Sequence, residues 1–389
     1  MSRSPGHAGN NALRLGFIAL TVILVLPLTA CSSGSERAKP MPLEVIASPI
    51  EVRRVWQVEV GDSEGTFLRP CALEHAIYAA SRKGSLVRID PSSGKEIWRV
   101  QVDGGIGAGV GSDGLTVAVV GPRGNVQAYD AEGKSLWQAQ APSDVVAPPL
   151  VGHDLVLVRS TDQRITAYEA ASGKRRWVFQ KQQPPLALRA EADLALSGED
   201  VLVGFPGGRL GSVALSNGAG RWEAAVSEPK GATEVERLAD VIGVPGVVEG
   251  DVCTASYQGR IGCFDTRNGD LRWAREFSAG AGVAVSDDAV YGVDASSHVT
   301  GFKRTSGASL WQSGALANRE LSAPVVIGKV LAAGDFEGRI HFLRLDDGKL
   351  VGRFDAAGGR VISTPQTWNG LALFQTARGY LVLLSVAGE

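Results

Sequence analysis

The chain has 389 residues, of which 49 are glycine, and its formal net charge is −2. A charge so close to balance argues against a nucleic-acid-binding protein, which needs a strongly basic surface. A length of 389 residues ordinarily indicates two or three domains. That expectation does not hold for a chain built from repeats, because added repeats enlarge a single domain.

The first 30 residues are predicted to be a lipoprotein signal peptide. Arg3 and Arg14 give this segment a positive start, and an apolar run from Leu15 to Leu28 follows. The run is shorter than the roughly 20 residues that a membrane-spanning helix needs. Its end, Leu28-Thr29-Ala30-Cys31, resembles a bacterial lipobox, in which Cys31 becomes the lipidated first residue of the mature protein. A plain secretory signal with an incidental cysteine is the alternative.

Residues 31–49 are rich in serine and proline and are predicted to form a flexible tether. Ser32, directly after the lipobox cysteine, resembles the residue that sorts such lipoproteins to the outer membrane. The remainder, 50–389, is predicted to be one folded domain in an exported, oxidising compartment.

A strand-like phrase recurs seven times along the chain, at a spacing of about 40 residues. In its clearest copy, Leu86-Val87-Arg88-Ile89-Asp90 is followed by Gly94 and Trp98. The alternation of apolar and polar residues predicts a half-buried strand, the glycine predicts a turn, and the tryptophan belongs to the next strand. The complete copies end in Trp98, Trp137, Trp177, Trp222, Trp273 and Trp311. The seventh copy has Gly348 but carries Gly352 where the tryptophan belongs.

Each repeat is long enough for four short strands, the size of one propeller blade. The predicted fold is therefore all-β, an eight-bladed β-propeller of four-stranded repeats. Seven blades lie within the chain, and the last blade combines the N-terminal strand around Trp56 with the C-terminal stretch 375–386. This pairing closes the ring and leaves no open sheet edges at its ends. The repeated tryptophan is expected to pack between blades, whereas Trp368, outside the frame, is expected to be local core.

Two neighbouring connections between blades, 181–191 and 227–243, carry extra residues. Both follow a tryptophan strand, so both are expected on the same rim of the ring, where insertions in repeat proteins often form binding surfaces. The first holds Leu186, Leu188 and Arg189 after a pair of prolines. The leucines are either exposed partner contacts or side chains folded back onto the blade.

The second connection contains a helix-start pattern. Thr233-Glu234-Val235-Glu236 matches a capping box, which predicts a short helical turn. Asp240 follows it at the end of the connection.

Cys253 and Cys263 flank a predicted hairpin turn at Tyr257-Gln258-Gly259. A three-residue turn places the two cysteines opposite each other on one face of the hairpin. They are expected to form either a cross-strand disulfide or two buried thiols.

No arrangement of residues in the sequence predicts catalysis, a metal site or a cofactor. Gly109 to Gly114 matches G-x-G-x-x-G, but a predicted strand and not a helix follows it, so the segment is expected to be a turn. The five histidines are scattered, and histidine and cysteine show no metal-ligand spacing.

The lipobox, the eight PQQ-like repeats and the loop pieces Leu-x-Leu-Arg and Glu-Arg-Leu-x-Asp-Val together resemble the BamB family of the outer-membrane β-barrel assembly (BAM) complex. The resemblance implies a non-enzymatic lipoprotein scaffold, lipid-anchored at the periplasmic face of the cell outer membrane. It implies that Leu186, Leu188, Arg189 and Asp240 bind the POTRA domains of BamA. Nascent outer-membrane proteins are a second candidate partner. The chain departs from the family at Ile242, where the family carries a second acidic residue.

Two alternatives stay open from the sequence. A PQQ-dependent quinoprotein dehydrogenase is built from similar repeats, but such an enzyme resembles a longer chain with a quinone pocket, a calcium site and two adjacent cysteines. This chain has no adjacent cysteines. A generic periplasmic propeller that binds another envelope partner is the other alternative.

Overall fold

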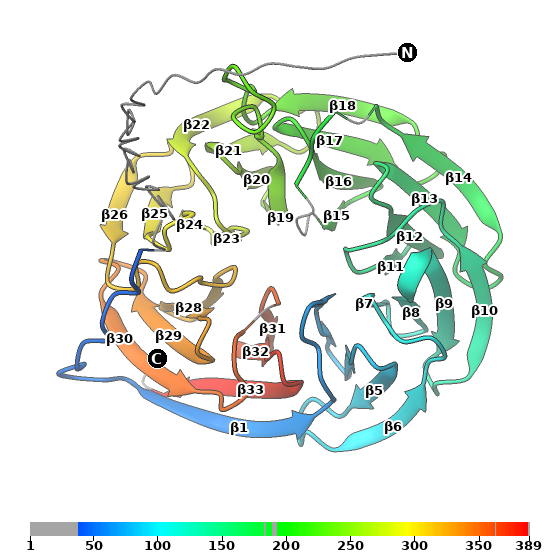
Figure 1. The fold of residues 1–389 in the computed structure, drawn as a ribbon, viewed down its shortest axis with the longest axis horizontal. Coiled ribbons are helices and arrows are strands. Elements are labelled where there is room, and N and C mark those ends of the chain that lie inside the picture. Colours follow the sequence, from blue (N-terminus) through cyan, green and yellow to red (C-terminus); the bar gives the residue numbers. More distant parts are fainter. Residues whose placement is uncertain (1–37, 183, 189–192, 362, 388–389) are drawn as a thin grey trace, which may run out of the picture. The chain divides into compact units, whose positions relative to one another are not determined.

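The computed structural model describes residues 38–182, 184–188, 193–361 and 363–387 (Figure 1). The predicted signal peptide, Cys31 and Arg189 lie outside the described residues. Within them the regular secondary structure is β-strand, apart from one short 3₁₀ turn, η1 (Pro122–Gly124). None of the described residues belongs to a helix long and apolar enough to cross a bilayer.

The described strands form eight sheets, arranged as the blades of a ring around a central channel (Figure 1). Within each blade, four antiparallel strands follow one another from the innermost to the outermost position. Blade 1 consists of β3 (Cys71–Leu73), β4 (Ala76–Ala80), β5 (Ser85–Ile89) and β6 (Glu96–Gln101). Blade 2 consists of β7 (Ala108–Ser112), β8 (Thr116–Val120), β9 (Asn125–Asp130) and β10 (Ser135–Gln140), with β2 (Phe67–Leu68) added in parallel to β7. Blade 3 consists of β11 (Leu150–Gly152), β12 (Leu155–Arg159), β13 (Arg164–Glu169) and β14 (Arg175–Gln180). Blade 4 consists of β15 (Leu194–Ser197), β16 (Asp200–Phe205), β17 (Arg209–Ala214) and β18 (Gly220–Ala225).

The second half of the ring repeats this order. Blade 5 consists of β19 (Val241–Val248), β20 (Asp251–Ser256), β21 (Gly259–Asp265) and β22 (Leu271–Phe277). Blade 6 consists of β23 (Ala284–Val285), β24 (Ala289–Val293), β25 (Val299–Lys303) and β26 (Ser309–Ser313). Blade 7 consists of β27 (Val325–Ile327), β28 (Val330–Gly334), β29 (Arg339–Arg344) and β30 (Leu350–Asp355). Blade 8 consists of β31 (Gln366–Trp368), β32 (Leu371–Gln375), β33 (Tyr380–Ala387) and β1 (Glu51–Glu59). The predicted eight-bladed propeller is confirmed.

Blade 8 combines the two ends of the folded domain, as the sequence predicted. β1 pairs antiparallel with β33, so that Trp56 lies opposite Leu383 and Glu59 lies opposite Tyr380. The N-terminal strand thus supplies the outermost position of the last blade. Because the two chain ends share one hydrogen-bonded ladder, the ring has no open end between blade 8 and blade 1.

The folded domain begins earlier than the predicted boundary at residue 50. Residues from Lys39 onward belong to the same compact unit as the ring. The Met41 N–H donates to the Ala317 carbonyl at 2.9 Å, and Leu43 packs against the core between blades 6 and 7. The polar composition of 31–49 predicts a free tether, but its few apolar residues bring the described part of it onto the ring.

The apolar core lies between adjacent blades and not within a single sheet. Leu157 and Trp177 of blade 3 share one buried cluster with Val203 and Phe205 of blade 4. Each blade has two apolar faces, and a neighbouring blade covers each of them. No blade can therefore be stable alone, which is the general property of repeat folds.

Seven tryptophans join the outermost strand of one blade to the next blade. Each indole Nε1 donates a hydrogen bond to a backbone carbonyl of the following blade, and each ring lies against a turn glycine there. The donor and acceptor residues are Trp56 and Pro91 (2.8 Å), Trp98 and Ala131 (2.8 Å), Trp137 and Ala170 (2.7 Å), Trp177 and Leu215 (2.8 Å), Trp222 and Thr266 (2.9 Å), Trp273 and Arg304, and Trp311 and Leu345 (2.6 Å). The glycines are, in the same order, Gly94, Gly133, Gly173, Gly218, Gly269, Gly307 and Gly348. The predicted position of the tryptophans between blades is confirmed.

The missing tryptophan of the seventh repeat has a topological cause. The glycine that would receive it belongs to the turn between the third and fourth strands of the next blade. In blade 8 those strands are β33 and β1, which lie at opposite ends of the chain, so no turn connects them. Gly352 occupies the tryptophan position, and a Cβ on it would lie only 2.9 Å from Ile50. The chain leading into β1 fills this space instead.

Trp368 is only partly the local core residue that the sequence predicted. Its side chain is half-buried against the core between blades 8 and 1. Its indole Nε1 donates to the Glu74 carbonyl of blade 1 at 3.0 Å. Because it stands on the innermost strand, it joins the two blades near the channel, whereas the repeated tryptophans act at the perimeter.

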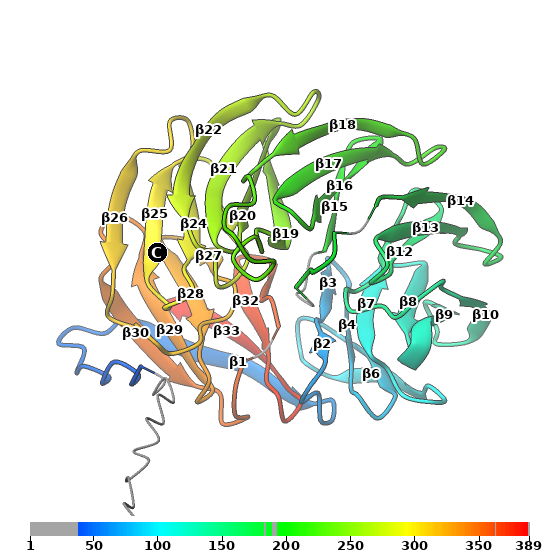
Figure 2. The ribbon, with the colours of Figure 1, turned by 45° about the horizontal axis from the view of Figure 1, so that its top comes forward.

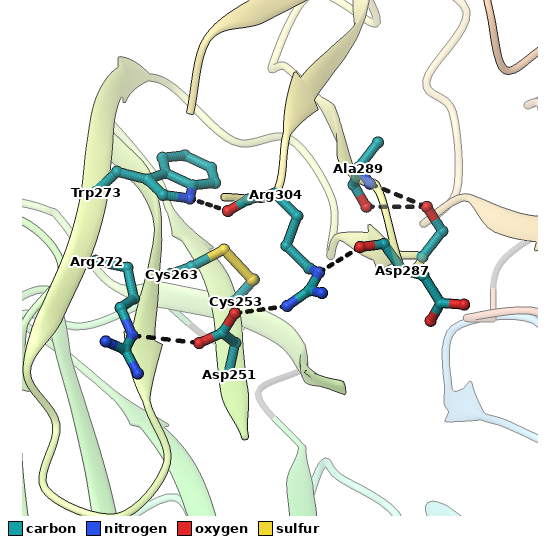
Figure 3. The surroundings of a disulfide bond; sticks show 9 residues. Asp251, Cys253, Cys263, Arg272, Trp273, Asp287, Ala289 and Arg304 are labelled. Carbon is teal, nitrogen blue, oxygen red and sulfur yellow. Dashed lines mark hydrogen bonds and ion pairs between the residues drawn. A yellow bond between two sulfur atoms is a disulfide. The ribbon is translucent and has the colours of Figure 1, made fainter. Parts of the chain in front are cut away.

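Blade 5 contains a disulfide and is joined to blade 6 by a buried arginine (Figure 3). Cys253 lies opposite Cys263, which is the register expected from the hairpin, and a disulfide links the two residues. Arg304 of blade 6 donates to Asp251 at 2.6 Å and to Glu249 at 2.7 Å, both in blade 5. Each nitrogen of this guanidinium therefore has an acceptor, since its Nε donates to a backbone carbonyl of blade 6.

Replacing the glycine under a tryptophan should destabilise the ring more than replacing a glycine in an open turn. Gly173 has φ +70°, and a Cβ on it would lie 2.5 Å from the Trp137 ring. Gly198 has φ +58°, but a Cβ on it would have no atom within 4 Å. Gly198→Ala should cost about 1 kcal/mol for the left-handed backbone alone. Gly173→Ala should cost about 1–3 kcal/mol more, because the indole of Trp137 must move. Urea denaturation measures both, and equal losses would contradict the packing role of Gly173.

Candidate functional site

The two long connections lie on the same rim of the ring. In every blade the outermost strand ends at one rim, and the connection to the next blade starts there; we call this the loop rim. The turns between third and fourth strands lie on the opposite rim. The connections 181–193 (β14 to β15) and 226–240 (β18 to β19) are the longest of those in the described chain. They leave consecutive blades, so they are neighbours on the loop rim, as predicted.

The first connection is fixed at both ends. At its start, Lys181 Nζ pairs with Glu223 at 2.5 Å and lies 4.6 Å from the centre of the Phe205 ring. At its end, the buried Asp193 forms an ion pair with Arg69. The position of the described part, 184–188, is therefore limited by blade 4 on one side and by Arg69, which directly precedes blade 1, on the other.

The structure separates the two leucines that the sequence could not distinguish. Leu186 is 41% exposed. Leu188 is half-buried and packs against the core of blade 5, in a cluster that includes Ile242 and the Cys253–Cys263 disulfide. The folded-back alternative thus describes Leu188, while Leu186 is available to a partner.

Asp240 is buried and holds the two connections together. Its Oδ2 accepts the Leu188 N–H at 2.5 Å, and its Oδ1 accepts the Gly207 N–H at 2.9 Å. Its own carbonyl accepts the Tyr257 N–H at 2.9 Å. One residue therefore links the connection before blade 4, a turn within blade 4 and a turn within blade 5. Only 5% of Asp240 is exposed, so its role is to position the loops rather than to present a charge.

A buried group of charges lies beneath this junction. Burial lowers the pKa of Arg159 to about 10, against the opposing charges of Asp193 and Asp240. Burial raises the pKa of Asp193, although Arg69 and Arg159 both oppose that shift. Alternating charges of this kind compensate one another in a medium where an isolated charge would be costly. They fix the base from which the first connection emerges.

The second connection contains the predicted capping box. The Glu236 N–H donates to Thr233 Oγ1 at 3.2 Å, and the Thr233 N–H donates to Glu236 Oε2 at 3.1 Å. The hydrogen bonds that the Thr233 and Ala232 N–H groups donate to the Glu236 carboxylate lower its pKa. The segment forms a single turn, in which Val235 is 61% exposed. Val235 is thus a second exposed apolar side chain on the loop rim, beside the connection that carries Leu186.

Ile242, which stands where the resemblance implies a second acidic residue, is part of the core of the site. It is 7% exposed, pairs with Ala255 in blade 5 and belongs to the cluster that receives Leu188. An apolar residue at this position gives the Leu188 side chain a surface to pack against. An acidic side chain in the same place would need a partner, because a buried unpaired carboxylate is costly.

A cavity of about 910 Å³ opens at the channel mouth on the loop rim. Its wall is formed by connections of blades 5 to 8 and 1, and includes Ile242, Glu320, Arg360 and Arg378. Its charged side chains carry both signs, and Arg360 pairs with Glu320. In the described residues there is no group of three or more His, Cys, Asp or Glu side chains that could hold a metal ion.

Sequence reasoning found the loops and Asp240 but missed the buried charges beneath them. Asp193, Arg159 and Arg69 come from three blades, and none belongs to the repeated phrase. In the sequence, Val235 is only one of the two residues between Thr233 and Glu236 in the capping box. No spacing in the sequence could have revealed the buried charges, because their neighbours are set by the ring and not by the chain.

Comparison with known proteins places the chain among assembly factors. A family model described as "Outer membrane protein assembly factor BamB" matches residues 82–313. The BamB protein of Bordetella pertussis is 42% identical over 382 residues, which are 98% of each chain. That of Burkholderia pseudomallei is 38% identical over 343 residues, covering 88% of this chain and 90% of the relative.

Solved structures give the same result. The crystal structure of BamB from Moraxella catarrhalis superposes with a TM-score of 0.79 at 28% identity, over 86% of this chain and 100% of that chain. Quinohemoprotein alcohol dehydrogenase from Comamonas testosteroni has a TM-score of 0.64 at 12% identity, over 92% of this chain and 82% of that one, and shares the fold alone. The chain therefore belongs to the BamB family of outer membrane protein assembly factors.

Proposed function

We propose that the protein is a non-enzymatic outer-membrane lipoprotein of the BAM complex, which binds the POTRA domains of BamA and assists the assembly of outer-membrane β-barrel proteins. The observation that carries this proposal is the Asp240 junction, because it makes two long loops into one surface on the loop rim. The relatives with the highest similarity quoted above are named outer membrane protein assembly factors.

The residues of the site have different roles in this proposal. Leu186 and Arg189 contact the partner, Leu188 supports the loop from below, and Asp240 positions it. A leucine followed three positions later by an arginine suits the centre of an interface, where an arginine can form a two-point pair with a carboxylate. Nascent outer-membrane proteins are a further candidate partner, to which no described residue is assigned.

A lipid anchor at Cys31 completes the proposal and would hold the protein at the periplasmic face of the outer membrane. The competing function, a quinoprotein dehydrogenase, has support only from the shared fold. The absorbance spectrum and the native mass of the purified protein distinguish the two, since a bound quinone is visible in both.

Truncating the exposed leucine should weaken BamA binding without loss of stability. Leu186→Ala should weaken binding to purified POTRA domains at least about tenfold, since such anchors contribute about 1.4 kcal/mol or more. Leu188→Ala should weaken binding and also lower the melting temperature, because Leu188 is packed against blade 5. Leu310→Ala is the control: it removes a leucine of similar exposure (50%) from blade 6 and should change neither quantity. Unchanged binding by Leu186→Ala would show that this loop is not the contact.

Removing the Asp240 carboxylate should release the first connection from the ring. Asp240→Ala leaves the Leu188 and Gly207 N–H groups without their acceptors, and each such loss costs about 1–3 kcal/mol when buried. Hydrogen exchange at these two amides should accelerate, and BamA binding should fall with it. Asp346→Ala, which removes an exposed carboxylate of blade 7, should alter neither. Weaker binding with unchanged exchange would mean that Asp240 contacts the partner directly.

Cys31→Ala should prevent lipidation and release the protein from the membrane. One acyl chain holds a protein only marginally, whereas the several chains of a mature lipoprotein hold it stably. The measurement is partitioning between detergent and aqueous phases. Equal partitioning of variant and parent would exclude Cys31 as the anchor.

A further inference from the structure

The segment that leads into β1 is attached to the loop rim. The Met41 N–H donates to the Ala317 carbonyl at 2.9 Å, and Asn318 Nδ2 donates to the Lys39 carbonyl at 3.2 Å. Ala317 and Asn318 belong to the connection between blades 6 and 7, which is of the same class as the two long loops. Residues 39–44 are thus bound at the loop rim, and the chain before them extends from that rim. We call residues 39–44 the clasp segment.

A buried arginine makes this attachment specific. Arg319 is 3% exposed, and its Nε is held by Asp335 at 2.8 Å. Its Nη1 then faces outward and donates to the Met41 carbonyl at 3.2 Å. Leu43 packs against the apolar cluster that contains Leu321. The clasp segment is therefore held by backbone hydrogen bonds and by an apolar contact.

The strand that follows starts at the opposite rim. β1 is an outermost strand, and such strands run toward the loop rim. Between the clasp segment and β1 the chain passes along the outer strand of blade 7, beside β30 in Figure 2. There the Glu44 carbonyl accepts Arg353 Nη2 at 3.2 Å, and the Ile50 N–H donates to the Val351 carbonyl at 2.8 Å. Residues 39–50 thus carry the chain from one rim to the other.

We propose that the clasp segment turns the loop rim toward the lipid surface, so that the anchor and the partner surface share one face of the ring. This inference rests on the proposed lipidation of Cys31. An extended chain spans at most about 3.4 Å per residue, so Cys31 lies within about 27 Å of Lys39. Without the clasp, the tether would extend to Ile50, would allow about 65 Å, and would leave from the opposite rim.

The consequence is a limit on how the protein can meet its partner. The loops that carry Leu186 and Val235 lie on the rim that the short tether holds near the bilayer. A partner domain that binds these loops must therefore lie between the ring and the membrane or beside that space. The short tether between Cys31 and Lys39 allows the propeller few orientations at the membrane. The clasp segment therefore limits contact with the partner to one face of the propeller.

Energy transfer to a membrane dye tests the proposal on the mature chain. The chain from Cys31 onward, carrying Cys71→Ser, is coupled through the Cys31 thiol to a maleimide lipid in phosphatidylcholine vesicles. A donor dye is attached through azidophenylalanine at Ala295, in a turn on the loop rim, or at Thr305, in a turn of the same blade on the opposite rim. Transfer to an acceptor lipid should be at least about twofold greater from position 295.

Two matched insertions separate the clasp from the tether. About 20 Gly/Ser residues between Gly34 and Ser35 add an average reach of about 25 Å and should at least halve the transfer from position 295. The same insertion between Ala47 and Ser48, beyond the clasp segment, should leave it unchanged. Equal losses from both insertions, or greater transfer from position 305, would overturn the proposal. Because the coupling is chemical, this result does not depend on whether the cell lipidates Cys31, and absence of that lipid would count against the proposed anchor only.

Discussion

The structure depends on one contact repeated around the perimeter, a tryptophan of one blade lying on a turn glycine of the next. Each contact combines burial of a large aromatic ring with a hydrogen bond from its indole to a backbone carbonyl. It therefore fixes both the separation and the relative height of two blades. Because a four-stranded sheet cannot cover its own faces, these contacts decide whether the chain forms a ring or a set of unpaired hairpins.

The same contact explains the irregularities at the ends of the chain. A tryptophan in blade 7 would have no turn to receive it, since blade 8 is assembled from β33 and β1. Ile50 occupies that place, and Trp368 adds a separate link between blades 8 and 1 near the channel. Toward blade 7, the closing blade thus has backbone pairing of the chain before β1 in place of the perimeter contact. Toward blade 1, it keeps the perimeter contact of Trp56 and adds an inner tryptophan. Because the propeller closes in this way, the repeat lacks its tryptophan at one position, Gly352.

The fold could be predicted from the sequence because its signals are local and repeated. The Gly-to-Trp spacing gave the blade count, and the alternation of residues around the hairpin turn gave the register of Cys253 and Cys263. The site could be predicted only in part. Asp240 and Leu188 are 52 positions apart, and the carboxylate reaches the amide only after two blades have packed. The clasp segment could not be predicted for a similar reason, since the residues that bind it lie almost 280 positions away in the chain.

The two rims of the ring differ in how freely they can change, and this difference accounts for the position of the site. Turns on the opposite rim carry the glycines beneath the tryptophans, so an insertion there would move the glycine and separate two blades. Connections on the loop rim make no such contact and can lengthen at a small entropic cost. The two long loops, the Asp240 junction, the cavity at the channel mouth and the clasp segment all lie on that rim. A repeat protein with one constrained rim can thus lengthen its connections on the other rim, where changes in loop length leave the packing between blades intact.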